Sequence, residues 1–162
     1  MTLHAKRTDG GTSNVNNPPA GKPWVWLTAD MLSSLAWRSL SANGRRLIDF
    51  LLVEHCRHAG KKNGELLATY KQLREYGLTA DCIRTAIIEC EVLGLIECQH
   101  GGRWSKTNKP STYRLTFYGD CNGNAATNDW KAANARLEVQ GKVIQRRPKR
   151  RTTKLATTAS LI

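Results

Sequence analysis

Two helical segments joined by a short turn restrict the fold of this chain more than any other feature. Thr69 and Gln72 have the spacing of a capping box, which favours the start of a helix, and Gly77 favours its end. Thr79 follows at once and can cap a second, longer helix. Gly94 is placed to end that second helix.

The second helix has a clear apolar face. Its sequence, ADCIRTAIIECEVL, puts Ile83, Ala86 and Ile87 on the side that must be buried, and this turns Arg84 and Thr85 outward. Two helices linked by a short turn, with the second one longer and opened by a cap, form the helix-turn-helix pattern.

A β-hairpin is predicted directly after these helices. Residues 95–100 and 112–118 have the composition of strands, and a polar loop joins them. The tip of this hairpin carries three cations, one aromatic residue and no acid: Arg103, Trp104, Lys106 and Lys109. Hairpin tips are often polar for solubility alone, but this set favours a wing that binds a nucleic-acid groove.

The elements upstream complete one domain. Helical spacing predicts a helix over 41–60 that opens at Ser41, and 65–68 is an apolar run of strand length. A shorter helix, ADMLSSLAW, is predicted after Thr28, with Met31, Leu32 and Leu35 on one face. Three tryptophans are expected to anchor the core, with base stacking as the alternative role: Trp24, Trp26 and Trp37.

The chain divides into one domain and polar flanks. We expect a disordered leader over 1–22, a domain over 23–119, a linker with a weakly amphipathic helix over 120–142, and a basic disordered arm over 143–162. The predicted fold class is α+β: a three-helix core plus a β-hairpin wing, with disordered N- and C-terminal tails.

The distribution of charge points to phosphate. The net charge is +12, yet residues 41–99 carry eight lysines and arginines against eight acids. Residues 100–118 carry four cations and no acid, and residues 119–162 carry nine cations against three acids. A neutral segment followed by two basic ones suits a nucleic acid, and a basic surface that only keeps the chain in solution is the alternative.

Several segments carry a family resemblance, in the order helix–strand–helix–helix–strand–wing–strand over 37–118. They are WRSLS at 37–41, RRLI at 45–48, YKQLREYGLTADCIRTAIIECEVLGLIEC at 70–98 and, after the basic loop, YRLTF at 113–117. This arrangement resembles winged helix-turn-helix DNA-binding proteins of bacterial prophages and mobile elements, and also the winged-helix domains of plasmid replication initiators. The resemblance implies a double-stranded DNA partner and no cofactor. It implies regulation of transcription in a bacterium, prophage or mobile element, or an accessory role in replication or partition.

The DNA-binding residues are predicted from the geometry of such domains, in which the second helix enters the major groove. On that helix they are Thr79, Asp81, Arg84 and Thr85. Asp81 either takes part in recognition or only stabilises the helix N-terminus. Lys71 and Arg74 on the preceding helix are candidates for backbone contact. The arm supplies cations suited to the minor groove: Arg146, Arg147, Lys149, Arg150 and Arg151.

Other classes of function are disfavoured. The five cysteines contain no C-x-x-C pair, so no zinc site is predicted, and the four histidines are scattered, so we expect no enzyme and no small-molecule ligand. No run reaches the about 18 apolar residues of a membrane span, which favours a cytoplasmic, nucleoid-associated protein. An RNA reader would need exposed aromatics on a sheet, and Trp104 is the one candidate. A homodimer through the N-terminal helix or residues 128–140 is left open.

Overall fold

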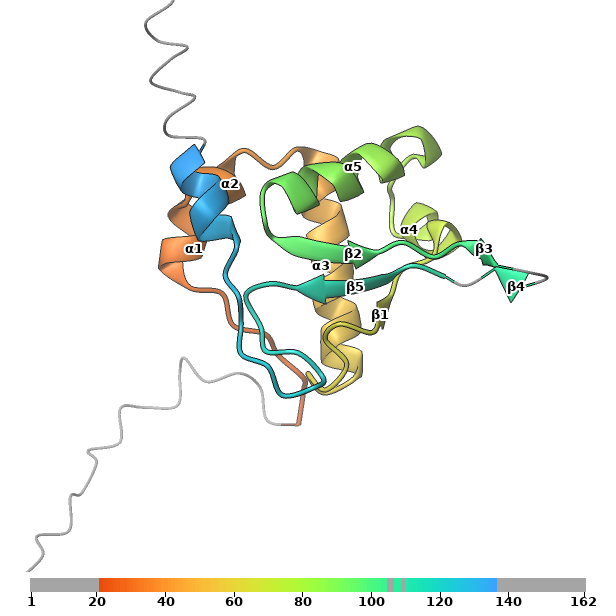
Figure 1. The fold of residues 1–162 in the computed structure, drawn as a ribbon, viewed down its shortest axis with the longest axis horizontal. Helices are drawn as coiled ribbons and strands as arrows, with labels where there is room; N and C mark the ends of the chain where they lie inside the picture. Colours follow the sequence, from red (N-terminus) through yellow and green to blue (C-terminus); the bar gives the residue numbers. More distant parts are fainter. Residues whose placement is uncertain (1–20, 105–106, 109, 137–162) are drawn as a thin grey trace, which may run out of the picture.

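The computed structural model describes residues 21–104, 107–108 and 110–136, which combine helices with a small three-stranded antiparallel sheet (Figure 1). This is the α+β class that the sequence predicts. The helices are α1 (Ala29–Ser33), α2 (Leu35–Arg38), α3 (Ala42–Arg57), α4 (Tyr70–Glu75) and α5 (Ala80–Val92). The strands are β1 (Leu66–Leu67), β2 (Ile96–Gln99), β3 (Arg103–Trp104), β4 (Thr107–Asn108) and β5 (Thr112–Leu115). Residues 130–136 are also helical. The predicted arm, 143–162, lies outside the described residues, as does the leader up to residue 20.

Local capping signals place the main helices where the sequence predicts them. The Ser41 side chain accepts a hydrogen bond from the backbone N–H of Gly44 and so begins α3. Both halves of the capping box form at α4, since Thr69 accepts from the N–H of Gln72 and the Gln72 side chain accepts from the N–H of Thr69. Gly94, with φ +67°, follows the end of α5. These three predictions are confirmed.

The predicted helix over 29–37 is wrong in one respect, because Ser34 divides it. Ser34 has extended backbone angles, its hydroxyl donates to the carbonyl of Met31, and it accepts from the N–H of Trp37. The same side chain therefore ends α1 and begins α2. Met31 is buried as predicted, but Leu32, which also lies in α1, is exposed.

The sheet has β5 in the centre, between β1 and β2. Ile96 of β2 pairs with Leu115 of β5, and Leu66 of β1 pairs with Tyr113. All four of these side chains are almost fully buried. They pack with the apolar sides of α3 and α5 in one core, whose fully buried helical members include Leu47, Ile48, Leu51 and Ile83.

The link between β2 and β5 projects from the body of the molecule (Figure 1). Within it, β3 pairs antiparallel with β4, and Arg103 lies opposite Asn108. The strand–loop–strand segment predicted over 95–118 is thus a hairpin, although β5 ends at Leu115 and residues 116–118 turn away.

The core continues beyond Gly119, where the sequence suggested a linker. Trp130 and Ala133 are buried, and the side-chain oxygen of Asn134 accepts hydrogen bonds from the backbone N–H groups of Leu35 (2.6 Å) and Ala36 (3.3 Å). Residues 130–136 therefore cap α2 and pack beside it, as Figure 1 shows. It overlaps residues 128–140, one of two segments considered for pairing subunits, and its Trp130 and Ala133 are buried within its own chain.

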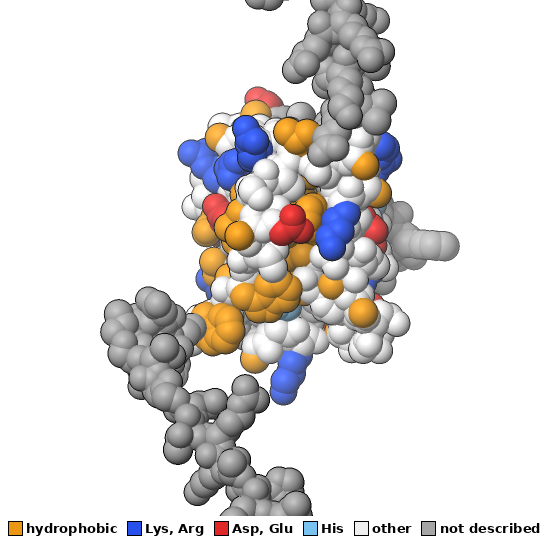
Figure 2. Space-filling view, turned by 90° about the vertical axis from the view of Figure 1, so that its left-hand side faces the viewer, with side chains coloured by type: hydrophobic (Ala, Val, Ile, Leu, Met, Phe, Trp, Pro, Cys, Tyr) orange, Lys and Arg blue, Asp and Glu red, His pale blue; other side chains and the backbone are white. Residues whose placement is uncertain are grey.

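The tryptophan prediction holds for Trp37 and is wrong for Trp24 and Trp26. Trp37 is 8% exposed, whereas Trp24 and Trp26 are 60% and 49% exposed. They precede α1 on the outside of the fold, and Trp26 rests edge-on against Tyr118, with 4.9 Å between ring centroids. Hydrophobic side chains accordingly gather on the face shown in Figure 2, the side of the molecule away from β3 and β4.

Candidate nucleic-acid interface

α5 has one buried and one exposed face. Ile83, Ala86 and Ile87 are at most 4% exposed, while Arg84 and Thr85 are exposed. A residue next to a buried position points about 100° away from it around a helix, so this orientation follows from the packing of α5. The sequence predicted it from the apolar spacing alone.

Contacts with α3 fix the position of α5. The backbone N–H and the hydroxyl of Ser41 both donate to the carboxylate of Glu89, at 2.6 Å each. Gly44 allows this close approach, because a Cβ there would lie 2.8 Å from a Glu89 carboxylate oxygen. The N-terminus of α3 thus holds the last turn of α5.

The turn between α4 and α5 is also fixed. Leu78 is 2% exposed and anchors the turn in the core. On the outside, the Arg46 guanidinium donates to the carbonyl of Gly77 at 3.0 Å. No local signal in the sequence could link Arg46 to a turn 31 residues away.

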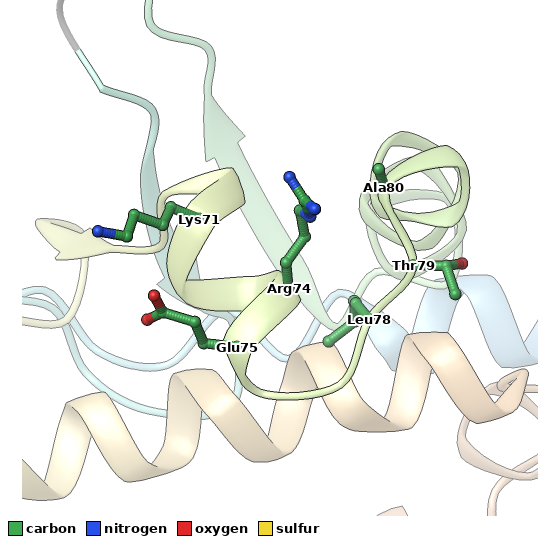
Figure 3. Close-up of a pocket in the computed structure, with 6 residues that line it drawn as sticks. All are labelled: Lys71, Arg74, Glu75, Leu78, Thr79 and Ala80. Atoms are coloured by element: carbon green, nitrogen blue, oxygen red, sulfur yellow. The ribbon is translucent and has the colours of Figure 1, made fainter.

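α4 places two cations beside the start of α5. Lys71 and Arg74 are exposed and line an open groove of about 560 Å³. In Figure 3, Arg74 extends toward the side on which Ala80 lies, whereas Lys71 points away from α5. Glu75 lies on the same rim, so the groove is not purely basic.

A second groove places Arg84 between α4 and the hairpin. Its volume is about 430 Å³, and its lining comes from three elements: Tyr70, Arg84, Ile87, Ile88, His100 and Ser111. Tyr70 and Ile88 are 53% and 47% exposed. Arg84 therefore lies on a concave surface with apolar neighbours, and the base of the hairpin forms its other wall.

The N-terminus of α5 differs from the prediction in one detail. Thr79 occupies the N-cap position, but its side chain makes no capping hydrogen bond. The exposed carboxylate of Asp81 lies in the first turn. Because a helix N-terminus attracts negative charge, Asp81 stabilises α5 electrostatically where Thr79 does not cap it.

The structure describes only some of the remaining predicted site residues. Arg103 and Trp104 lie in β3, and their side chains are not described; Lys106, Lys109 and the arm residues 146–151 lie outside the described residues. Arg114, one of the four cations of 100–118, bonds both carboxylate oxygens of Glu97 at 3.2 Å. Its charge is thus partly neutralised within the fold.

The expectation that Trp104 is the one exposed aromatic is wrong. Trp24, Trp26, Tyr70 and Tyr76 are all exposed. They lie on helices and on the segment before α1, however, and Tyr113, the aromatic residue of the β1–β5–β2 sheet, is 1% exposed. A sheet that reads bases by stacking would present such a residue to solvent.

Among the helices of the described part, none has the length and apolar character needed to cross a membrane. Comparison of the chain with protein-family models, with curated proteins and with solved structures finds no match in any of the three. The function is therefore argued from the surface formed by α4, α5 and the hairpin.

Proposed function

We propose that this protein binds double-stranded DNA through a winged helix-turn-helix, in which α4 and α5 are the two helices and the β2–β5 hairpin is the wing. One observation carries the proposal. Arg84 lies on the exposed face of a helix held at its last turn and at the turn that precedes it, in a groove shared by α4 and the hairpin base. In helix-turn-helix proteins this face of the second helix meets base edges.

The exposed side chains match the chemistry of a major groove. An arginine can donate two hydrogen bonds to O6 and N7 of one guanine, and a threonine can contact a phosphate or a thymine methyl group. We assign the first role to Arg84 and the second to Thr85. Ile88, exposed one turn along, adds apolar contact. Asp81 accepts a hydrogen bond from cytosine or serves the helix N-terminus alone.

Phosphate contacts are assigned to the cations around α5. Lys71 and Arg74 are exposed on α4 and line the groove that the start of α5 also lines. Further contacts to phosphates and to the minor groove are assigned, because of their positive charge, to Arg103, Lys106, Lys109 and the arm. Such contacts position a protein on the duplex and carry little sequence information.

The test is binding of the full chain to a labelled duplex across a range of salt concentrations. About six neutralised phosphates give a log–log slope near −5, at about 0.9 per phosphate. The double substitution K71A/R74A should weaken binding to all duplexes and make the slope shallower by about 2. The control is K61A/K62A, which removes the same charge from the exposed turn after α3. A wild-type slope shallower than about −2, or equal losses in both variants, would overturn the proposal.

We further propose that the bound DNA is a promoter, so that the protein regulates transcription in a bacterium, prophage or mobile element, on the nucleoid and in the cytoplasm. A footprint across the upstream region of its own gene tests this output. Protection confined to a replication origin would instead assign an accessory role in replication.

A further inference from the structure

Three side chains with metal-ligating atoms meet where α5 packs against the base of the hairpin. Glu91 comes from the last turn of α5, Cys98 from β2, and His100 from just beyond β2. One ligating atom from each lies within 4.8 Å of the other two. Because alternate residues of an extended chain point to the same side, Cys98 and His100 both face the helix that carries Glu91.

The distances are close to those of a bound metal. The Cys98 Sγ and His100 Nδ1 atoms are 3.5 Å apart. In a tetrahedral zinc site, bonds of about 2.3 Å to sulfur and about 2.0 Å to nitrogen also place these two atoms about 3.5 Å apart. The Nε2 atom of His100 lies 3.9 Å from a carboxylate oxygen of Glu91. The His100 side chain is 67% exposed, so it is free to turn toward either partner.

The surroundings orient the carboxylate. The second Glu91 oxygen accepts a hydrogen bond from the backbone N–H of Cys98 at 3.3 Å, which leaves the first one directed at the histidine. Hydrogen bonds of this kind fix the ligands of metal sites. Tyr113 lies opposite Cys98 in the β2–β5 pairing, and its buried hydroxyl interacts with the side chains of Cys98 and Ser111. A further polar group thus lies beside the cluster.

We propose that Glu91, Cys98 and His100 bind one zinc ion, with a water molecule in the fourth position. Thiolate and imidazole ligands select zinc over magnesium or calcium, and three protein ligands with one open position are a known zinc arrangement. Without a metal, the exposed pair of His100 and Glu91 at 3.9 Å stabilises the fold little. With zinc, the cluster fastens the hairpin base to α5.

Through His100 the site borders the groove that holds Arg84, so zinc binding is tested without DNA. The full chain, stripped with a chelator, is titrated with Zn²⁺ in competition with a chromophoric chelator, and one ion per chain is expected. Co²⁺ in place of Zn²⁺ should give thiolate-to-metal charge-transfer absorption. His100→Ala and Cys98→Ser should each weaken binding at least tenfold. The matched controls, His58→Ala and Cys121→Ser, remove an imidazole and an exposed thiol elsewhere and should leave affinity unchanged.

Two results would overturn the zinc site: no stoichiometric binding by the wild-type chain, or binding that survives His100→Ala and is lost in Cys121→Ser. Should Cys98→Ser fail to fold, His100→Ala decides alone, because most of that side chain is in solvent. If the wild-type chain bound DNA but no zinc, this inference would fail and the proposed function would stand.

Discussion

Asn63 and Leu115 exchange two hydrogen bonds across 52 residues of chain. The side-chain N–H₂ of Asn63 donates to the carbonyl of Leu115 at 2.9 Å, and the backbone N–H of Leu115 donates to Asn63 Oδ1 at 2.7 Å. The same N–H₂ group also lies within hydrogen-bond distance of the carbonyls of Tyr118 and Gly119. One fully buried amide therefore holds the end of β5, and the chain that leaves it, against the turn after α3.

Asn63→Ala should lower the free energy of unfolding by about 3 kcal/mol or more. The substitution leaves the buried N–H of Leu115 and several carbonyls without this partner, and each unsatisfied buried group costs about 1–3 kcal/mol. Urea denaturation measures the change. Asn122→Ala, at an exposed loop position, is the control and should change stability by less than about 0.5 kcal/mol. A small loss at Asn63 would mean that water replaces the amide.

Gly94→Ala and Gly77→Ala form a matched pair. Both glycines have positive φ, +67° and +100°, so an alanine at either position costs about 1–2 kcal/mol in backbone strain. A Cβ at Gly94 would also lie 2.6–2.8 Å from backbone atoms of Asp129 and Trp130, whereas a Cβ at Gly77 meets nothing within 4 Å. Gly94→Ala should therefore be the more destabilising by about 1–3 kcal/mol in thermal or urea unfolding. Equal losses would show that residues 129–130 do not pack there.

The sequence predicted the elements whose causes are local. The Ser41 cap, the Thr69–Gln72 capping box and the helix end at Gly94 depend on contacts within a few residues, so a short pattern reveals them. Asn63 resembled an ordinary turn residue because its partners lie more than 50 positions away. The helix expected within 120–142 is only weakly amphipathic, so its pattern did not reveal that Trp130 is buried.

In the candidate site, too, the features with local causes were predicted and those that join distant elements were not. The outward direction of Arg84 follows from helical periodicity and was predicted, while the bond from Arg46 to Gly77 joins separate elements and was not. The cluster of Glu91, Cys98 and His100, for which zinc is proposed, was not predicted because its side chains come from a helix and from a strand with the residue beyond it. Spacing rules search for paired cysteines and histidines, and here the third ligand is a carboxylate seven residues before Cys98.

His55 should make stability depend on pH. Burial lowers the pKa of His55 below its ordinary value of 6.5, and the ring stacks on Tyr118 with 4.5 Å between centroids. The unfolded chain therefore binds a proton at His55 more readily than the folded chain does. The stability that neutral His55 contributes is fully present above pH 6.5 and is lost as the pH falls below it. Denaturation between about pH 7 and 5 should show a decline that His55→Gln flattens. His58→Gln, the control on the same helix, should keep the decline; if it removes the decline instead, the titrating group is misassigned.

Arg84 should set base preference. Once a preferred duplex has been selected from a random pool with the full chain, Arg84→Ala should cost about 1–3 kcal/mol on that duplex and much less on random DNA. Arg84→Lys is the sharper variant: it keeps the charge but loses the planar fork that bonds two guanine atoms. It should therefore lose most of the preference at one base pair while retaining binding to random duplexes. Lys106→Ala in the hairpin should weaken binding to both duplexes by similar amounts.

The opposite pattern would mean that the hairpin, and not α5, reads the bases. If Arg84→Ala lowered binding to preferred and random duplexes equally, while Lys106→Ala changed the selected base, α5 would contact phosphates and the hairpin would contact bases. The packing of α5 argues against that outcome. Ser41 holds its last turn through Glu89, and Arg46 holds the turn that precedes it, so Arg84 is presented by a helix fixed at two points. A side chain on such a support loses little freedom on binding, which favours the discrimination of one base from another.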